Sequence, residues 1–453
     1  MKCHCPTVRY LIVIIAFAVR TVSGQPEASS QETTASSSSQ SPLDGIRITN
    51  ASFYGTYYSS LAMVGGPSGY DVSAGGSATL RWSRTRSRSS ISWNYTAAYT
   101  RDITYSAINA LNHDLSLTYG YKIHPNWSLV GGVTAEVVNT YQFVFEPNSL
   151  SQALQVAGTP DELAATVLSN TSYDNTRLTA LLTGVPSVNS PASRLFFGDR
   201  TLNAAFRTGV TYRKARLSIL FEGEGTRIQH LSEGSTGQPA TTSYLLGDSN
   251  TGQVGMNLSY SLSPRTQIGA SVAAQRTFSQ FEDVYTTTTT ATFGRRMSER
   301  WFTEMHGGLG FFRPVRSSFQ LPTGPQYIMG GNAGFKTPGH AFLVSVDRSI
   351  ANSYGYGGSS NLSTTAAWNW GRRNGGWRIQ ASESWQQIQI AGLPDVNAWL
   401  TTVGFTEPLA GRKAITFTYT YMRTTNAYTS MLNNQAIQGL RIAFVWAPMT
   451  IAN

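Results

Sequence analysis

The sequence predicts an all-β fold, a transmembrane antiparallel β-barrel of about 18 strands with short periplasmic turns and long extracellular loops. Apolar and small polar residues alternate with a period of two over most of the chain. Turn residues separate these segments, and the connections are alternately short and long. Only 13% of residues are charged, against about 25% in ordinary soluble domains.

The alternation is clearest in two segments near the C-terminus. In residues 414–421 the odd positions are Ile, Phe, Tyr and Tyr, and the even positions are Ala or Thr. In residues 439–446 the even positions are Leu, Ile, Phe and Trp. Because side chains alternate between the two faces of a strand, each segment has one apolar wall and one wall of smaller or polar residues. Such strands suit a barrel with lipid outside and water inside.

The first 24 residues predict a secretory signal peptide. Lys2 and Arg9 precede an apolar core over residues 11–19, and Val22 and Gly24 supply the small residues before cleavage. The alternative, a membrane anchor, is disfavoured because the apolar run is short.

Both cysteines, Cys3 and Cys5, lie before the apolar core, so we expect no disulfide in the mature chain. Residues 25–45 are rich in Ser and Gln and have almost no apolar content, which predicts a disordered periplasmic leader. The barrel is expected over residues 46–447, followed by a C-terminal tail at 448–453.

Strand counting gives an expected topology. A first strand near residues 48–60 leads to an even count of about 18 strands, as in bacterial single-chain barrels. An even count places the N- and C-termini on the same side, which we expect to be the periplasmic side of the bacterial outer membrane.

Tryptophans gather near the short turns and the C-terminus. This placement is typical of an aromatic girdle, because an indole buries its ring and leaves its N–H among lipid headgroups. Arginine and lysine flank the same turns, which suits an anionic leaflet. The alternatives are a soluble aromatic core and a nucleic-acid patch, and the spread of cations over eight turns disfavours the second. The girdle residues are Trp82, Trp93, Trp127, Trp301, Trp370, Trp377 and Trp446.

Charged residues also occur on the expected lumen face. Mixed charge suits a solvated lumen. Two interpretations are open, general polarity of the wall and a dedicated binding site, and the first is the simpler. The lumen-facing candidates are Arg81, Asp114, Glu136, Arg207, Glu222, Glu224, Glu304, His306 and Arg441. Glu383 falls on the outer face, which implies either a bulge in that strand or a position near the edge of the bilayer.

The longest connection, residues 145–200, contains a helix-start pattern at Thr159, Pro160 and Glu162. This loop is expected to be extracellular and partly helical. It could fold into the lumen and narrow it, stand outside as a lid, or decorate the surface.

No catalytic arrangement is recognisable. The histidines are scattered singly. Glu222 and Glu224 share one face of a strand, but paired carboxylates in a barrel lumen are commoner than catalytic pairs. The sequence has no metal-spaced cluster and no phosphate-binding loop, so neither an enzyme nor a cofactor is expected.

The C-terminus resembles the signal that the outer-membrane assembly machinery recognises, a glycine followed by alternating hydrophobic residues and a final aromatic. Here the residues are Gly439, Ile442, Phe444 and Trp446, although the chain continues beyond Trp446 and classical porins end in phenylalanine. The chain after residue 45 is similar to uncharacterised porin-like outer-membrane β-barrel proteins of Gram-negative bacteria, including barrels that accompany polysaccharide export systems.

A barrel of about 18 strands holds an aqueous lumen unless a loop or another chain fills it, so we expect a porin-like passive channel for small hydrophilic solutes. The alternatives are a barrel accessory or conduit of a polysaccharide export system, and a non-conducting surface or adhesion protein. The implied partners are outer-membrane lipid and the assembly machinery, with no nucleic acid. A homo-oligomer and an export-system partner stay open alternatives.

Overall fold

The structure is a computed structural model. The chain divides into residues 1–44 and the unit Gly45–Asn453, and every described residue belongs to the second. No helix among the residues described is long and apolar enough to cross a membrane. The expected signal peptide, leader, helical loop and C-terminal tail lie outside the described residues. The described residues are 46–61, 69–104, 110–139, 200–231, 248–279, 282–317, 321–337, 339–353, 356–371, 376–389, 395–410, 412–425 and 436–446.

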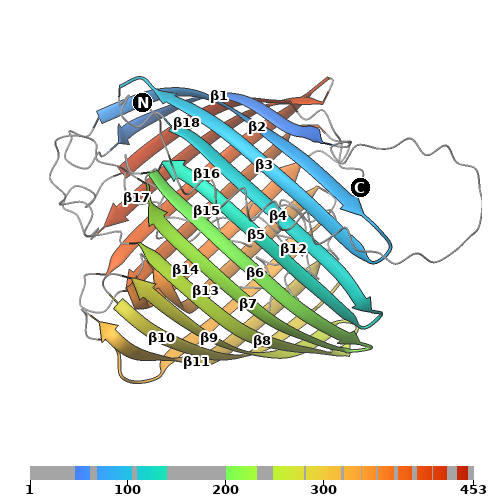
Figure 1. Cartoon of the computed structure of the whole chain (residues 1–453). Helices are drawn as coiled ribbons and strands as arrows, with labels where there is room; N and C mark the ends of the chain where they lie inside the picture. The colour runs from blue at the N-terminus through green and yellow to red at the C-terminus, as the bar shows by residue number, and fades with distance from the viewer. Residues whose placement is uncertain are drawn as a thin grey trace, which may run out of the picture. The chain divides into compact units, whose positions relative to one another are not determined.

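The described residues form eighteen strands that follow one another round a single sheet (Figure 1). The strands are β1 (Arg47–Leu61), β2 (Gly69–Thr85), β3 (Ser89–Asp102), β4 (Ala110–His124), β5 (Trp127–Asn139), β6 (Arg200–Lys214), β7 (Leu217–His230), β8 (Ser249–Ser263), β9 (Thr266–Ser279), β10 (Glu282–Arg296), β11 (Trp301–Ser317), β12 (Gln326–Lys336), β13 (His340–Ser353), β14 (Tyr356–Gly371), β15 (Arg378–Gln389), β16 (Val396–Leu409), β17 (Lys413–Thr425) and β18 (Ala436–Trp446).

The sheet is closed by its first and last strands. β1 pairs antiparallel with β18 from Ala51 opposite Trp446 to Tyr58 opposite Gly439. Every other strand pairs antiparallel with its neighbours in the chain, so the eighteen-stranded sheet has no free edge. The predicted fold class and strand number are therefore confirmed.

The connections divide between the two ends of the barrel. The end that carries the connections after even-numbered strands is called the short-turn end, and the other is called the long-loop end. The predicted short turns are confirmed, for example at residues 86–88 and 215–216. The alternation of short and long is incomplete, because only residues 280–281 join β9 to β10 and only residues 354–355 join β13 to β14.

The two faces of the wall differ as the alternation predicts. Large hydrophobic side chains exposed within the strands face outward, as Phe53 does at 71% exposure. The inward face is lined mainly by Ser, Thr, Asn, Gln, Gly and charged residues, which exchange hydroxyl contacts such as Ser52 to Ser77 at 2.7 Å. The closed sheet satisfies the backbone hydrogen bonds, and the apolar exterior suits contact with lipid. The architecture is therefore that of a transmembrane barrel.

Glu383 faces outward near the middle of β15. It lies opposite Ala366 on β14 and Thr401 on β16, and both registers run past it without a shift. The bulge considered from the sequence is therefore wrong. The alternation holds through this strand, and Glu383 is a carboxyl group on the outer wall.

The β13–β14 hairpin extends beyond its neighbour. Pairing of β12 with β13 ends at Met329 and Arg348, whereas β13 and β14 stay paired further along. β14 also contacts β9 and β10, which are not its neighbours in the sheet. A Cβ on the inward-facing Gly310 of β11 would lie 2.2 Å from Ile350 Cδ1. The hairpin therefore leans across the lumen side of β11, and glycine at residue 310 leaves room for it.

Candidate functional site: the polar lumen wall

The nine sequence-predicted lumen residues all lie on the inward face. Their inward direction follows from the register, because directly opposed residues on neighbouring strands share a face. They do not form one site. They fall into separate groups on β2–β3, β4–β5, β6–β8, β11–β13 and β18–β1, described in turn below.

Two carboxylates oppose each other on β4 and β5. Asp114 lies opposite Glu136, and Glu136 lies opposite Asn203 on β6. Asp114 also faces Thr96 on β3. This row gives the wall two acidic groups in neighbouring positions with hydroxyl and amide groups beside them, an arrangement that attracts cations into the lumen.

A buried ion pair joins β6 to β7. Arg207 donates a hydrogen bond to Glu224, and the two side chains are 3% and 12% exposed. One position nearer the short-turn end, Asn257 of β8 donates to Glu222 Oε1 at 2.8 Å. The glutamates of one strand thus bond to opposite neighbours, Glu224 to β6 and Glu222 to β8, and the inward face of β7 is fixed on both sides.

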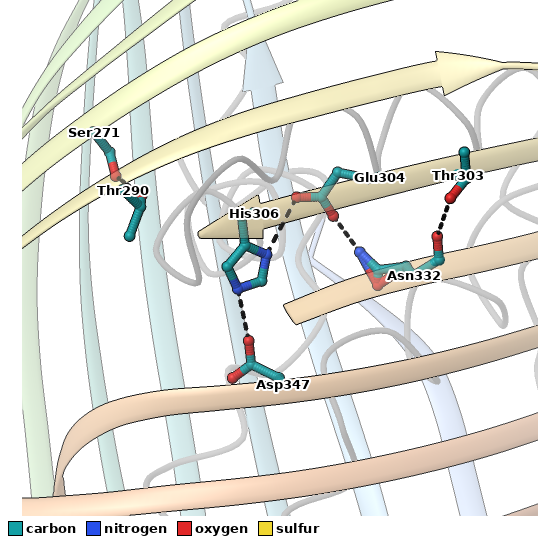
Figure 2. Close-up of polar contacts among 7 residues, drawn as sticks. All are labelled: Ser271, Thr290, Thr303, Glu304, His306, Asn332 and Asp347. Carbon is teal, nitrogen blue, oxygen red and sulfur yellow. Dashed lines mark hydrogen bonds and ion pairs between the residues drawn. The ribbon is translucent and has the colours of Figure 1, made fainter. Parts of the chain in front are cut away.

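A second network spans β11, β12 and β13 (Figure 2). His306 Nε2 lies 2.9 Å from Asp347 Oδ1, and His306 Nδ1 lies 3.6 Å from Glu304 Oε1. The Asn332 amide donates to the other oxygen of Glu304, whose side chain is only 2% exposed. Imidazole therefore stands between two carboxylates, hydrogen-bonded to Asp347 and within ion-pair distance of Glu304.

Further hydrogen bonds tie neighbouring strands of the wall together. The Thr303 hydroxyl donates to the Asn332 carbonyl at 3.0 Å, and on β9 and β10 the hydroxyls of Ser271 and Thr290 lie 2.5 Å apart (Figure 2). These contacts hold neighbouring strands in register, so the lumen carboxylates sit on a fixed wall rather than on loops.

Arg441 lies where the barrel closes. Its guanidinium carbon lies 4.0 Å from the centre of the Tyr54 ring, and the Tyr54 hydroxyl lies 2.7 Å from the Thr100 hydroxyl. Arg81 lies opposite Asn94 on β3 and opposite Arg47 on β1. The cation of Arg441 is thus held against an aromatic face, and Arg81 shares its row with a second cation near the short-turn end.

Inward charges are partly segregated along the barrel. Most inward cations of the described strands lie toward the short-turn ends, where the register places Arg81, Lys122, Arg213 and Lys336. Arg207 and Arg441 are exceptions because they lie mid-strand, and Glu304 is an acid near the short-turn end. Carboxylates dominate the middle and the long-loop half of the described wall. The inward carboxylates there are Asp71, Asp102, Asp114, Glu136, Glu222, Glu224, Glu282 and Asp347.

The nine lumen candidates named from the sequence do not include three polar partners, Asp347, Asn332 and Asn257. Each lies on the inward face, and alternation within β13, β12 and β8 gives that direction. Their contacts with His306, Glu304 and Glu222 depend on register between strands, which alternation does not give. Among the described residues, no group of three His, Cys, Asp or Glu has the geometry of a metal site.

The predicted girdle tryptophans lie near the short-turn end, and three of the four C-terminal signal residues face outward. Six of the seven predicted girdle residues lie in strands at or near the short-turn end, and Trp377 directly precedes β15. Neighbouring aromatics contact one another, as Trp127 and Tyr212 do at 4.8 Å between ring centres. In β18, Ile442, Phe444 and Trp446 are exposed on the outside, while Gly439 faces inward.

No protein-family model matches the chain, and no curated protein matches it. Among solved structures, the chain is similar to OpdQ of Pseudomonas aeruginosa, with 8% sequence identity and a TM-score of 0.43 over 88% of this chain and 98% of that chain. The outer membrane protein opdK of the same organism has 10% identity and a TM-score of 0.44, over 88% and 97% of the two chains.

OccK2 (OpdF) of Pseudomonas aeruginosa, solved in complex with glucuronate, has 9% identity and a TM-score of 0.44 over 90% of this chain and 100% of that chain. The likeness is one of fold alone, and the fold assignment itself rests on the closed eighteen-stranded sheet of this chain. The residue assignments above rest on the strand pairing of this chain alone.

Proposed function

We propose that the protein is a passive channel for small hydrophilic solutes in the bacterial outer membrane. The observation that carries this proposal is the polar inward face of a closed barrel of eighteen strands. Barrels of about 16 to 18 strands enclose an aqueous channel, whereas those of about eight are filled by side chains. The inward side chains line this channel with hydroxyl, amide and carboxylate groups that hydrated solutes can contact.

The charge pattern supports a solute class. Among the described residues, carboxylates outnumber cations in the middle and long-loop half of the inward wall, and Arg207 is engaged by Glu224. A passing cation therefore meets a net negative potential, and a passing anion is repelled. We propose that the channel favours cations and neutral hydrophilic solutes over anions.

We also propose that the short-turn end faces the periplasm. Both strand termini, Arg47 of β1 and Trp446 of β18, lie at that end. Bacterial barrels place short turns and both termini in the periplasm, and longer loops outside.

Conductance of the purified protein in a planar lipid bilayer tests the proposal. A channel produces stepwise current increments of uniform size on insertion, without any partner protein. Protein that is shown to be folded by its slower or faster gel migration before boiling, yet yields no current steps, would contradict the proposal. That outcome would favour the non-conducting alternatives, an export-system accessory or a surface protein.

A further inference from the structure

Arginines face outward near the long-loop ends of the odd-numbered strands. Strand register places each on the lipid side, opposite other outward residues, as Arg423 is opposite Trp399 and Arg348 opposite Met329. An outward cation at the end of a spanning strand can reach the headgroup region of a membrane. The set is Arg101, Arg227, Arg276, Arg313, Arg316, Arg348 and Arg423.

Four of these arginines lie close together on β7–β11, in two neighbouring rows of directly opposed residues. The first row contains Arg227, Asn250, Phe278, Asp283 and Arg316. The second row contains Gly225, Gly252, Arg276, Tyr285 and Arg313. Within the described residues of these rows, four arginines face one acid, which gives a net charge of 4 − 1 = +3.

Contacts with the wall fix two of the four guanidinium groups. Arg276 donates to both oxygens of Asp283, at 2.9 and 2.8 Å, and lies 5.1 Å from the Tyr285 ring centre. Arg316 lies 5.8 Å from the Phe278 ring centre and donates to the Ser279 carbonyl at 2.9 Å. Asp283, the single acid, is thus paired with Arg276. Aromatic rings lie against Arg276 and Arg316. Arg276 nevertheless stays accessible, with 49% of its side chain exposed.

The outward face carries no side chain at two positions beside these cations. Gly225 and Gly252 oppose each other on the outward face, next to Arg276 in the same row and beside Arg227 in the other. A Cβ on Gly252 would meet no atom within 4 Å, and one on Gly225 would meet only the Thr251 carbonyl at 4.0 Å. A headgroup can therefore approach the backbone here, between guanidinium groups that stand out from the surface.

We propose that this arginine patch, formed by Arg227, Arg276, Arg313 and Arg316, binds the phosphate of a membrane lipid headgroup at the long-loop end. Guanidinium groups match phosphate because they present several N–H donors in a planar fork. The lipid source follows from position, since the patch lies on the outward wall between exposed apolar side chains such as Phe278 and Tyr285. Acyl chains would cover that apolar surface while the phosphate meets the cations.

The test compares lipid retention by two charge-matched variants of the full-length protein. The patch variant carries Arg227→Gln, Arg313→Gln and Arg316→Gln, leaving the Arg276–Asp283 pair in place. The control variant carries Arg84→Gln, Arg86→Gln and Arg88→Gln, which removes the same charge at the short-turn end. Each protein is titrated in neutral detergent with bis-phosphorylated lipid A, and bound lipid is counted by native mass spectrometry.

We expect the patch variant to bind lipid A at least about tenfold more weakly than the native protein, because charge-assisted hydrogen bonds are lost. The control variant should bind it with nearly native affinity. Equal binding by both variants, or no dependence on the lipid phosphates after their enzymatic removal, would overturn the proposal. Inorganic pyrophosphate binding as tightly as the lipid would overturn the lipid source.

Folding is checked independently, because both variants must show the native shift between heated and unheated gel samples. If the patch variant does not fold, the single substitution Arg313→Gln replaces it in the same titration and is expected to weaken binding in the same direction. Conductance is recorded in parallel. The patch lies outside the lumen, so lost lipid binding with unchanged conductance separates this proposal from the channel function.

Discussion

His306 of β11 reaches Asp347 of β13 across the intervening strand, with 2.9 Å between Nε2 and Oδ1. The residue between them on β12 is Gly330, which is directly opposed to both. A Cβ at Gly330 would lie 2.5 Å from His306 Cε1 and 2.7 Å from Asp347 Oδ1. The absence of a side chain at Gly330 is therefore what lets the imidazole and the carboxylate meet.

Gly330→Ala should separate this pair and destabilise the barrel, because a methyl group takes the space that the imidazole occupies. We expect a loss of about 1–3 kcal/mol, typical of overpacking at a closely packed position. The measurement is the urea midpoint of unfolding in detergent, followed by tryptophan fluorescence. Gly307→Ala is the matched control, since its Cβ would meet only the Ile328 carbonyl at 4.0 Å. An equal drop in both midpoints would contradict the prediction.

Two adjacent threonines in the middle of β10 test the assignment of faces. Thr289 faces outward, whereas Thr290 faces inward, opposite Ser271 and Gly308. Thr289→Arg should impair membrane assembly, since an arginine near the bilayer midplane costs about 2–4 kcal/mol. Thr290→Arg should assemble, because its charge enters a hydrated lumen. The readout is the heat-sensitive fraction on gels, and equal assembly of the two variants would show that the faces are reversed.

Removal of Arg207 should strongly lower the stability of the barrel, because Arg207 forms a buried ion pair with Glu224. Arg207→Met leaves Glu224 buried without its cation, which costs about 3–5 kcal/mol for a broken buried pair. Arg207→Met combined with Glu224→Met should recover most of this loss, because the uncompensated charge is gone. Unfolding midpoints of the two variants give the comparison. A double variant no more stable than the single one would rule out the charge as the cause.

Charge neutralisation on β4 and β5 should reduce cation preference. Asp114→Asn with Glu136→Gln removes two opposed inward carboxylates while keeping their shape. In a potassium chloride gradient, the reversal potential should move toward zero as the cation-to-anion permeability ratio falls. Glu383→Gln serves as the control, because Glu383 faces outward and contributes little to the lumen potential. A native channel that prefers anions would contradict the proposed solute class.

The sequence predicted strand number and faces because both are local properties. A period of two tells which side of Phe417 or Thr418 meets lipid, and polar turn residues mark where each strand ends. Neither requires knowledge of a partner strand. The same reasoning placed all nine lumen candidates on a common face.

Side-chain partners were not predictable in this way. His306 and Asp347 are separated by 41 residues, so their contact depends on two registers and on a glycine between them. The contact of Ile350 with Gly310 likewise depends on the β13–β14 hairpin, which extends beyond β12. Alternation gives the direction of a side chain, whereas pairing across distant segments decides what it touches.

Closure of β1 on β18 has a consequence for biogenesis. The Gln438 amide donates to the Ser59 hydroxyl at 3.0 Å across 379 positions in the chain, so the seam joins the earliest and latest strands to be synthesised. Contacts of such separation carry a high entropic cost and form late. Until the final 11-residue strand is added, seventeen strands form an open sheet with two edges whose backbone N–H and C=O groups are unpaired. Such edges are unfavourable in lipid and can pair with other chains. A ribosome that stops before Ala436 would thus release a nearly complete polypeptide that is a substrate for chaperones and proteases rather than a smaller pore.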